Sequence, residues 1–266
     1  MNLQTLTLQS NAASKLMATS LERMGSGKKI NSAADNAAGV AILERLEAQG
    51  KAFNASIANA NNGISLLNTA DSAASGVQDG LQRLRELAVQ SANGILSDQD
   101  RDTIQAESSQ IQSEISRITQ DTEFNGRNLL ATEDSLNIQL GADGSRNASI
   151  STPNLTKTLN GQGLGAIDLG SQASSQSALS NIDAMLDSTS QVRSGFGAQA
   201  NRLVSSVANL TDQSISTAQS RSRIEDTDYA IESANFAAAN IKEQVGFAVQ
   251  AQANANAGQV LSLLSA

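Results

Sequence analysis

Three carboxylates lie close together at Glu225, Asp226 and Asp228, and side chains of this type could bind a cation. Their spacing is shorter than a dedicated cation-binding loop requires, so we expect them to cap the helix that follows. Lys28 and Lys29 form a basic pair, which we expect to lie in a solvated loop. The charged residues therefore predict no metal site and no cofactor.

Histidine and cysteine are both absent from the 266 residues. Without histidine the chain lacks the commonest metal ligand and general base, and without cysteine it lacks thiolates and disulfides. A Ser-His-Asp triad and a His-Glu-x-x-His zinc site are excluded, although a pair of carboxylates could still serve as acid and base. We therefore predict that the protein is not an enzyme.

Composition also limits the partners. The formal net charge of −8 and the sequence pI of about 4.6 disfavour nucleic acid and anionic membranes. No stretch approaches the ~20 apolar residues of a membrane-spanning helix, so we expect no membrane insertion. Aromatic residues make up 2% of the chain, so alanine, leucine, isoleucine and valine must form the core. Such side chains favour close contact between helices.

The stretch Leu81–Asn93 ends the longest heptad-like run of the sequence. Apolar residues recur before it at alternating steps of three and four, which predicts a coiled-coil helix over Ala55–Asn93. A slip near Asp71 is interpreted as a stammer within this helix. The predicted seam comprises Ala60, Ile64, Leu67, Ala70, Ala74, Val77, Leu81, Leu84 and Ala88.

Shorter or weaker helices are predicted on both sides of this run. One covers Leu3–Met24 and ends at glycines 25 and 27; the next covers Ala37–Gln49, with Ser32 or Asp35 as its N-cap. After Asn93-Gly94, Ser97–Asp100 can cap a helix whose apolar stripe runs from Ile104 to Ile118, and together with the long helix it predicts an antiparallel hairpin.

In the middle of the chain the spacing of apolar residues changes from the helical pattern to alternation. Leu136, Ile138 and Leu140 alternate with polar residues, residues 142–145 predict a turn, and Ala148 and Ile150 resume the alternation. This pattern predicts a β-hairpin at about 134–151. We expect an irregular connection from there to about 176, too polar to form a core of its own. Helical periodicity returns at about Ser177 and continues to about 217.

The last segment, Asp226–Leu264, is rich in alanine, asparagine and glutamine, so its helix buries little surface by itself. The predicted fold is mainly α: a long antiparallel coiled-coil rod with a small β-hairpin at its tip and paired terminal helices. The predicted domains are residues 1–31 and 226–266, the two halves of an inner helical domain, and residues 32–225, the rod.

Several segments resemble bacterial flagellin. The clearest is Leu81–Asn93. The other similar segments occur along the chain in the same order as in that family, and they are Ile30–Gly39, Asn61–Ser65, Ile104–Glu107, Thr122–Gly126, Ser222–Ala230 and Val260–Leu264. The resemblance covers nearly the whole chain outside its middle. It implies a subunit that is exported unfolded through the flagellar type III apparatus and assembles into the extracellular filament beneath a cap.

The resemblance also implies partners and functional residues. The subunit would bind further copies of itself, hook-junction proteins and a secretion chaperone, and a flagellin-sensing Toll-like receptor is a further expected partner. Residues expected at filament-core contacts are Leu3, Leu6, Met17, Val245, Val260, Leu261, Leu263 and Leu264. Residues expected on the outward face, where the next subunit or the receptor would bind, are Arg83, Glu86, Leu87, Gln90 and Glu107.

Two other functions are compatible with the same sequence features. A hook-filament junction protein or a flagellin-like surface adhesin could use the same scaffold. Only about fifty residues separate the two flagellin-like halves, so we expect a slim filament without large outer domains. At the level of single residues, Arg83 and Glu107 could equally be ordinary contacts between helices or subunits.

Overall fold

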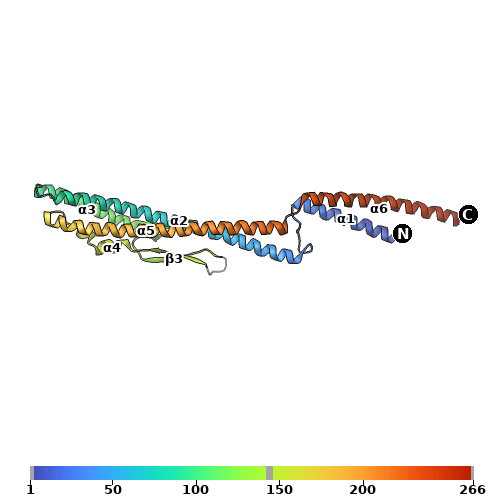
Figure 1. Cartoon of the computed structure of the whole chain (residues 1–266), viewed down its shortest axis with the longest axis horizontal. Helices are drawn as coiled ribbons and strands as arrows, with labels where there is room; N and C mark the ends of the chain where they lie inside the picture. Colours follow the sequence, from blue (N-terminus) through green and yellow to red (C-terminus); the bar gives the residue numbers. More distant parts are fainter. Residues whose placement is uncertain (1–2, 142–145, 265–266) are drawn as a thin grey trace. The chain divides into compact units, whose positions relative to one another are not determined.

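A computed structural model describes residues 3–141 and 146–264, of which residues 3–6, 257 and 260–264 are described without their side chains. The helices are α1 (Leu3–Ser26), α2 (Ala37–Ser91), α3 (Asp98–Asp121), α4 (Leu155–Gly161), the 3-10 turn η1 (Leu164–Ala166), α5 (Gln172–Glu225) and α6 (Tyr229–Leu264). The strands are β1 (Glu123–Phe124), β2 (Arg127–Asn128), β3 (Asp134–Gln139) and β4 (Asn147–Thr152). The expectation of a mainly α protein is confirmed (Figure 1).

The chain forms two compact units. Unit 1 comprises residues 1–50 and 215–266, and unit 2 comprises residues 51–214, so both boundaries fall inside the long helices α2 and α5. The boundaries predicted from the sequence, 31/32 and 225/226, fall instead where the terminal helices give way to the long ones. That division remains a prediction.

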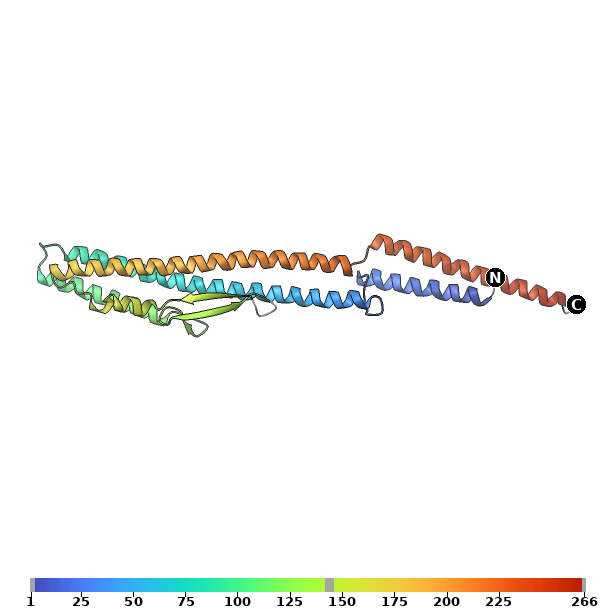
Figure 2. The same cartoon turned by 60° about the horizontal axis from the view of Figure 1, so that its bottom comes forward.

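In unit 1 the terminal helices α1 and α6 lie side by side, as expected (Figures 1 and 2). Small residues permit their close approach, because Ala13, Ser20 and Ala239 are all buried. The chain segments that join these helices to α2 and α5 also pair: the amide of Lys29 donates to the Glu225 carbonyl and that of Thr227 to the Gly27 carbonyl. Gly27 has a φ of +69°, which suits the end of α1.

The start of α2 differs from the prediction. Asn36 is the residue before the helix, and its side-chain oxygen accepts a hydrogen bond from the amide of Gly39 at 2.9 Å. Asp35 instead closes the preceding loop by accepting from the amides of Asn31 and Ser32. The helix then continues without interruption to Ser91, so the two helices predicted over 37–49 and 55–93 are one helix of 55 residues.

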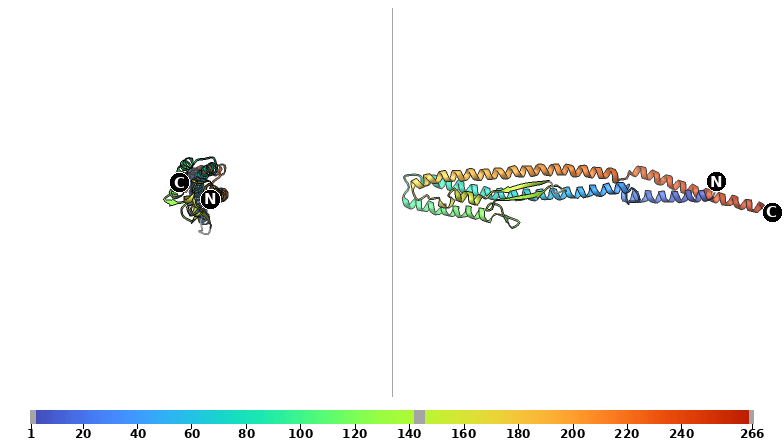
Figure 3. Two further views of the ribbon diagram at one scale, coloured as in Figure 1. Left: turned by 90° about the vertical axis from the view of Figure 1, so that its left-hand side faces the viewer. Right: turned by 90° about the horizontal axis from the view of Figure 1, so that it is seen from below.

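Unit 2 is built on α2, α3 and α5, which run alongside one another (Figure 3). The predicted seam of α2 is confirmed, since its members are buried apart from the half-buried Ile64. Ser97 caps α3 through a capping box with Asp100, as the sequence indicated. The helix α5 begins at Gln172, five residues before the predicted start, and its buried residues include Ile182, Met185, Phe196 and Leu203.

The predicted β-hairpin is confirmed, but its position is not. Strands β3 and β4 are antiparallel, with Leu136 opposite Ile150 and Ile138 opposite Ala148. The hairpin packs on the side of the helices, where Ile150 and Ile138 approach Gly63 of α2, and not at the tip. The turn predicted at 142–145 lies outside the described residues. The end of unit 2 is formed by the α2–α3 loop (Figure 1).

The sequence did not predict the shorter hairpin β1–β2. Asn125 and Gly126 connect its strands with φ values of +52° and +73°, as a type I′ turn requires. The expectation of an irregular connection from β4 to about residue 176 is wrong, although the segment forms no core of its own. It contains α4 and η1, and it buries Leu155, Leu159, Leu164, Ile167 and Leu169 against the helices.

No helix within the described ranges is long and apolar enough to cross a membrane.

Candidate assembly surfaces

The first surface is built on the pair α1–α6, which polar side chains hold in register. Glu232 is 5% exposed and accepts from the Ser20 hydroxyl at 2.9 Å and from the Arg23 guanidinium at 3.1 Å. Two turns further along α1, the Ser14 hydroxyl donates to Glu243 at 2.6 Å. The Tyr229 hydroxyl donates to the Met24 carbonyl. These bonds are specific, but they involve little apolar area.

Glu232 is ionised in this environment. Burial alone would raise the pKa of its carboxyl group, but hydrogen bonds from Ser20, Arg23 and Asn235 outweigh burial, and the pKa is lowered below its ordinary value. The charge of Glu232 therefore stabilises the α1–α6 pair.

Large apolar side chains remain exposed around this pair. They are Leu8, Leu16, Leu21, Ile231, Ile241, Val245, Phe247 and Val249. Several of them line a groove between α1 and α6 of about 490 Å³. We call this the terminal groove and define it by Ala12, Ala13, Leu16, Ile241, Val245 and Val249. Ile241, Val245 and Val249 recur every four residues, so they lie on one face of α6.

The residues predicted at filament-core contacts have different positions in this pair. Met17 is half-buried against α6, with its sulfur 4.0 Å from the side-chain amide of Asn240. Val245 is 55% exposed and lines the terminal groove. The side chains of Leu3, Leu6, Val260, Leu261, Leu263 and Leu264 lie outside the described residues. The role assigned to all of them remains a prediction.

The second surface is the outward face of α2 and α3 around Arg83. Its guanidinium donates to Glu107 from Nε at 3.0 Å and from a terminal nitrogen at 2.8 Å, and to Glu86 at 2.9 Å. Hydrogen bonds to Glu86 and then Glu107 raise the pKa of Arg83 above its ordinary value. Gln90 is exposed on the same helix. The structure thus brings four of the predicted residues to the surface and pairs three of them.

Leu87 is not part of that face. It is 2% exposed and belongs to the hydrophobic core of unit 2. The resemblance to flagellins implied an outward position for Leu87, which is not a member of the predicted seam. In the structure the buried stripe of α2 is wide enough to include both Leu87 and Ala88 where α3 and α5 pack on it. The outward position expected for Leu87 is therefore wrong.

Ion pairs between α2 and α5 were not predicted from the sequence. Arg193 donates to Asp71 at 2.9 Å and to Gln78 at 2.7 Å, and Arg85 donates to Asp183 at 2.7 Å. Asp71 is the residue where the seam slips, so the slip coincides with a cross-helix ion pair. A polar residue inside a heptad pattern could have signalled this contact, but the sequence does not identify its partner.

Of the three carboxylates near residue 226, Asp228 caps the following helix as predicted, whereas Asp226 accepts from the Ser222 hydroxyl of α5 and Glu225 forms ion pairs. Glu225 pairs with Lys28 at 2.5 Å and with Arg221 at 3.2 Å. Asp228 accepts from the amides of Ala230 and Ile231 at the start of α6. Within the described part of the chain, no group of three or more histidine, cysteine, aspartate or glutamate side chains could hold a metal ion.

Long coiled-coil helices with apolar side chains left at their surface define a class of structural, self-associating proteins. Comparison with known proteins narrows this class. The family model for the bacterial flagellin N-terminal helical region matches residues 1–135, and the model for the bacterial flagellin C-terminal helical region matches residues 179–264. The chain therefore belongs to the bacterial flagellin family.

Individual relatives agree with this assignment. The chain is 38% identical to a flagellin of Halalkalibacterium halodurans, over 92% of this chain and 90% of that protein. It is 34% identical to the flagellar filament 31.3 kDa core protein of Treponema maltophilum, over 93% and 92% of the two chains. Among solved structures it resembles Bacillus cereus flagellin, with a TM-score of 0.53 and 28% identity over 57% of this chain and 88% of that one.

Proposed function

We propose that this structural subunit of the flagellar filament assembles by burying its terminal groove against further copies of itself. The observation that carries the proposal is the set of large apolar side chains left exposed around α1 and α6. Full burial of an isoleucine or leucine side chain contributes about 1.5–3 kcal/mol. A thin helix pair gains this energy only when neighbouring subunits cover it, which links folding of unit 1 to assembly.

Seeded growth of filaments tests this role. Purified chain should elongate filament fragments, and Ile241→Asp should block elongation because it places a charge in the terminal groove. The matched control is Ile215→Asp, since Ile215 is 50% exposed and Ile241 is 61% exposed, but Ile215 does not line the groove. Equal elongation by both variants would reject the groove as an assembly surface. Deletion of residues 260–266 is likewise expected to permit export and prevent stable filaments.

The same assay separates the alternative functions. A hook-filament junction protein would bind the end of a fragment once and not elongate it, whereas a filament subunit adds repeatedly. A flagellin-like adhesin would need further surface structure, and between β2 and α5 the described residues add only the hairpin β3–β4, α4 and η1. We therefore expect a slim filament in an electron micrograph. Extra globular density on its outside would contradict this expectation.

Export and localisation are further parts of the proposal. We expect the chain to leave the cell unfolded through the flagellar type III apparatus, with a chaperone covering its apolar termini and a cap folding it at the filament end. The weak pairing of α1 with α6 supports export without prior folding. The test is the amount of subunit in the culture medium, which should fall to background when the export apparatus is inactivated.

The Arg83 surface is proposed as a contact for the next subunit and for a flagellin-sensing Toll-like receptor. Arg83, Glu86, Gln90 and Glu107 are exposed and could exchange their present partners for those of another chain. Arg83→Ala and Glu107→Ala should reduce signalling in a receptor reporter cell. Filament growth by the same variants shows whether the residues also serve assembly. Unchanged signalling would remove the receptor from the proposal.

A further inference from the structure

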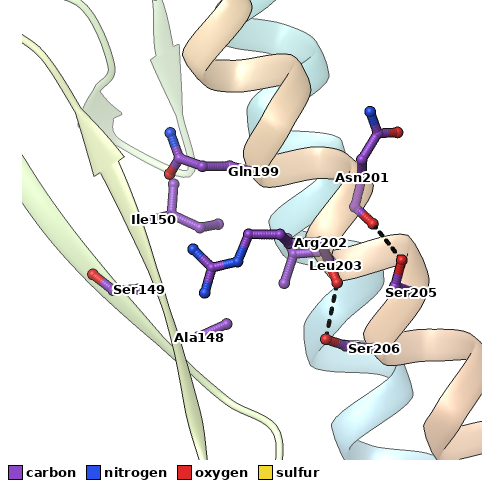
Figure 4. A pocket seen from close by; sticks show the side chains of 9 residues that line it. All are labelled: Ala148, Ser149, Ile150, Gln199, Asn201, Arg202, Leu203, Ser205 and Ser206. Carbon is purple, nitrogen blue, oxygen red and sulfur yellow. Dashed lines mark hydrogen bonds between the residues drawn. The ribbon is translucent and has the colours of Figure 1, made fainter.

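An open hollow lies between β4 and α5 in unit 2, and nothing so far described uses it. Its volume is about 320 Å³, and Figure 4 shows its lining side chains. Ile150 and Leu203 are 1% and 2% exposed and form an apolar floor, with Ala148 beside them. Ser149, Ser205 and Ser206 add hydroxyl groups. We call this site the β4 hollow.

One cation belongs to the β4 hollow. Arg202 extends from α5 toward β4, and its guanidinium lies between Ile150 and Ala148 (Figure 4). No carboxylate among the described residues forms an ion pair with it, although most arginines of unit 2 have such a partner. An apolar floor beside an unpaired guanidinium suits an apolar side chain with a neighbouring carboxylate.

A segment with this chemistry lies at the α2–α3 end of unit 2. Ile95 is 88% exposed, the highest value among the exposed large hydrophobic side chains of the described region. Asp98 and Asp102 follow it on one face of α3, and neither has an ion-pair partner in the described part of the chain. We call these three residues the acidic tip.

The loop that carries the acidic tip is held in shape. Arg101 is 5% exposed and donates to the Asn93 carbonyl at 2.8 Å, and the Ile95 amide lies 3.3 Å from the Asn93 side-chain oxygen that it donates to. A loop fixed in this way loses little conformational entropy on binding. Asp98, Asp100 and Asp102 are all exposed, and the Asp100 carboxylate accepts hydrogen bonds from Ser97.

We propose that the acidic tip of one copy docks in the β4 hollow of the next, with Ile95 on the apolar floor and Asp98 or Asp102 paired with Arg202. The two sites cannot meet within one chain. Gln172, where α5 begins, lies near Gly94 in the tip loop, and thirty residues of helix separate it from Arg202. At 1.5 Å per residue this is about 45 Å. The contact is therefore head-to-tail and generates an open chain of subunits.

This proposal rests on the proposed function, because it names one contact within the filament. Cross-linking tests it directly, since the chain contains no cysteine. Gln99→Cys beside the tip and Ser205→Cys in the lining of the hollow would be combined in one chain and treated with a short bis-maleimide after assembly. A head-to-tail contact predicts a ladder of linked multimers. Each single-cysteine variant is the control and should give no ladder.

Charge exchange provides a second, independent readout. Arg202→Glu should slow seeded elongation about tenfold. Adding Asp98→Arg and Asp102→Arg should restore the rate, because the two sites then attract each other again with their charges exchanged. Lys157→Glu makes the same charge change on α4, outside the hollow, and should elongate like the wild type. Circular dichroism of the unassembled variants checks that each remains folded.

The outcomes separate the two proposals. If the wild type elongates and neither the ladder nor the charge rescue appears, the tip-hollow contact is wrong and the filament role stands. If the wild type fails to elongate filament fragments, the proposed function is overturned and the contact with it.

Discussion

Two glycines one turn apart in α2 offer a sharp test of how closely its helices pack. A Cβ added at Gly76 would lie 3.6 Å from Cδ1 of Ile118, an ordinary van der Waals distance. A Cβ added at Gly80 would lie 2.9 Å from Cγ1 and 3.1 Å from Cδ1 of Ile115, which is 1% exposed. Replacing a helical glycine by alanine contributes about 1 kcal/mol of helix propensity in both cases.

The packing around each glycine decides whether its replacement by alanine raises or lowers the free energy of unfolding. We expect Gly76→Ala to raise the free energy of unfolding by about 1 kcal/mol. Gly80→Ala gains the same propensity but forces Ile115 to move in a filled core, which costs about 1–3 kcal/mol. The net effect at Gly80 is therefore a loss of about 1 kcal/mol, and the two variants should differ by about 2 kcal/mol.

Urea unfolding of the unassembled full-length chain, followed by circular dichroism, measures this difference. Ile115→Ala alone should cost about 2–5 kcal/mol because it leaves a cavity. In the double variant with Gly80→Ala the loss should be smaller than the sum of the single effects, since the added methyl group meets free space. If Gly80→Ala stabilised the chain as much as Gly76→Ala, the close α2–α3 contact at this position would be refuted.

Three further predictions concern single polar groups. Ser97→Ala should lower the free energy of unfolding by about 1 kcal/mol, because the α3 capping box is lost; Ser97→Asp, which can cap, is the control. The lowered pKa of Glu232 means that its stabilisation is present above the ordinary pKa of 4.5 and is lost as pH falls through the lower folded-state value. Glu232→Gln should flatten this acid dependence in the thermal unfolding of assembled filaments, where unit 1 is covered by its neighbours, and an unchanged profile would contradict it. Arg193→Met should cost at most about 1 kcal/mol, because the Asp71 pair is partly exposed; a double-mutant cycle with Asp71→Asn measures the coupling.

The helical parts of the fold could be predicted because their signals are local. The heptad steps of α2 and the apolar stripe of α3 specify their helices through side-chain spacing, and Gly27 marks the end of α1 through its backbone conformation. Alternation in β3 and β4 specified the hairpin for the same reason. Family membership also followed from the sequence, since its motifs are contiguous stretches of the chain.

Burial on a wide helix face could not be predicted in this way. Leu87 lies beside the strict seam, and whether it is buried depends on how many helices pack around α2. The connection after β4 was assigned as irregular because its leucines are separated by glycine and polar residues. They become core residues only because α3 and α5 together provide a surface for them.

Composition and short-range spacing specify the long helices and the β3–β4 hairpin, and they exclude histidine and cysteine chemistry. Which side chains remain exposed depends on how the helices pack together. Val245 and Ile95 are exposed while Leu87 is buried, and among the described residues Arg83 has two acidic partners while Arg202 has none. Exposure and pairing depend on residues distant in the chain, and those residues select the surfaces on which assembly should be tested.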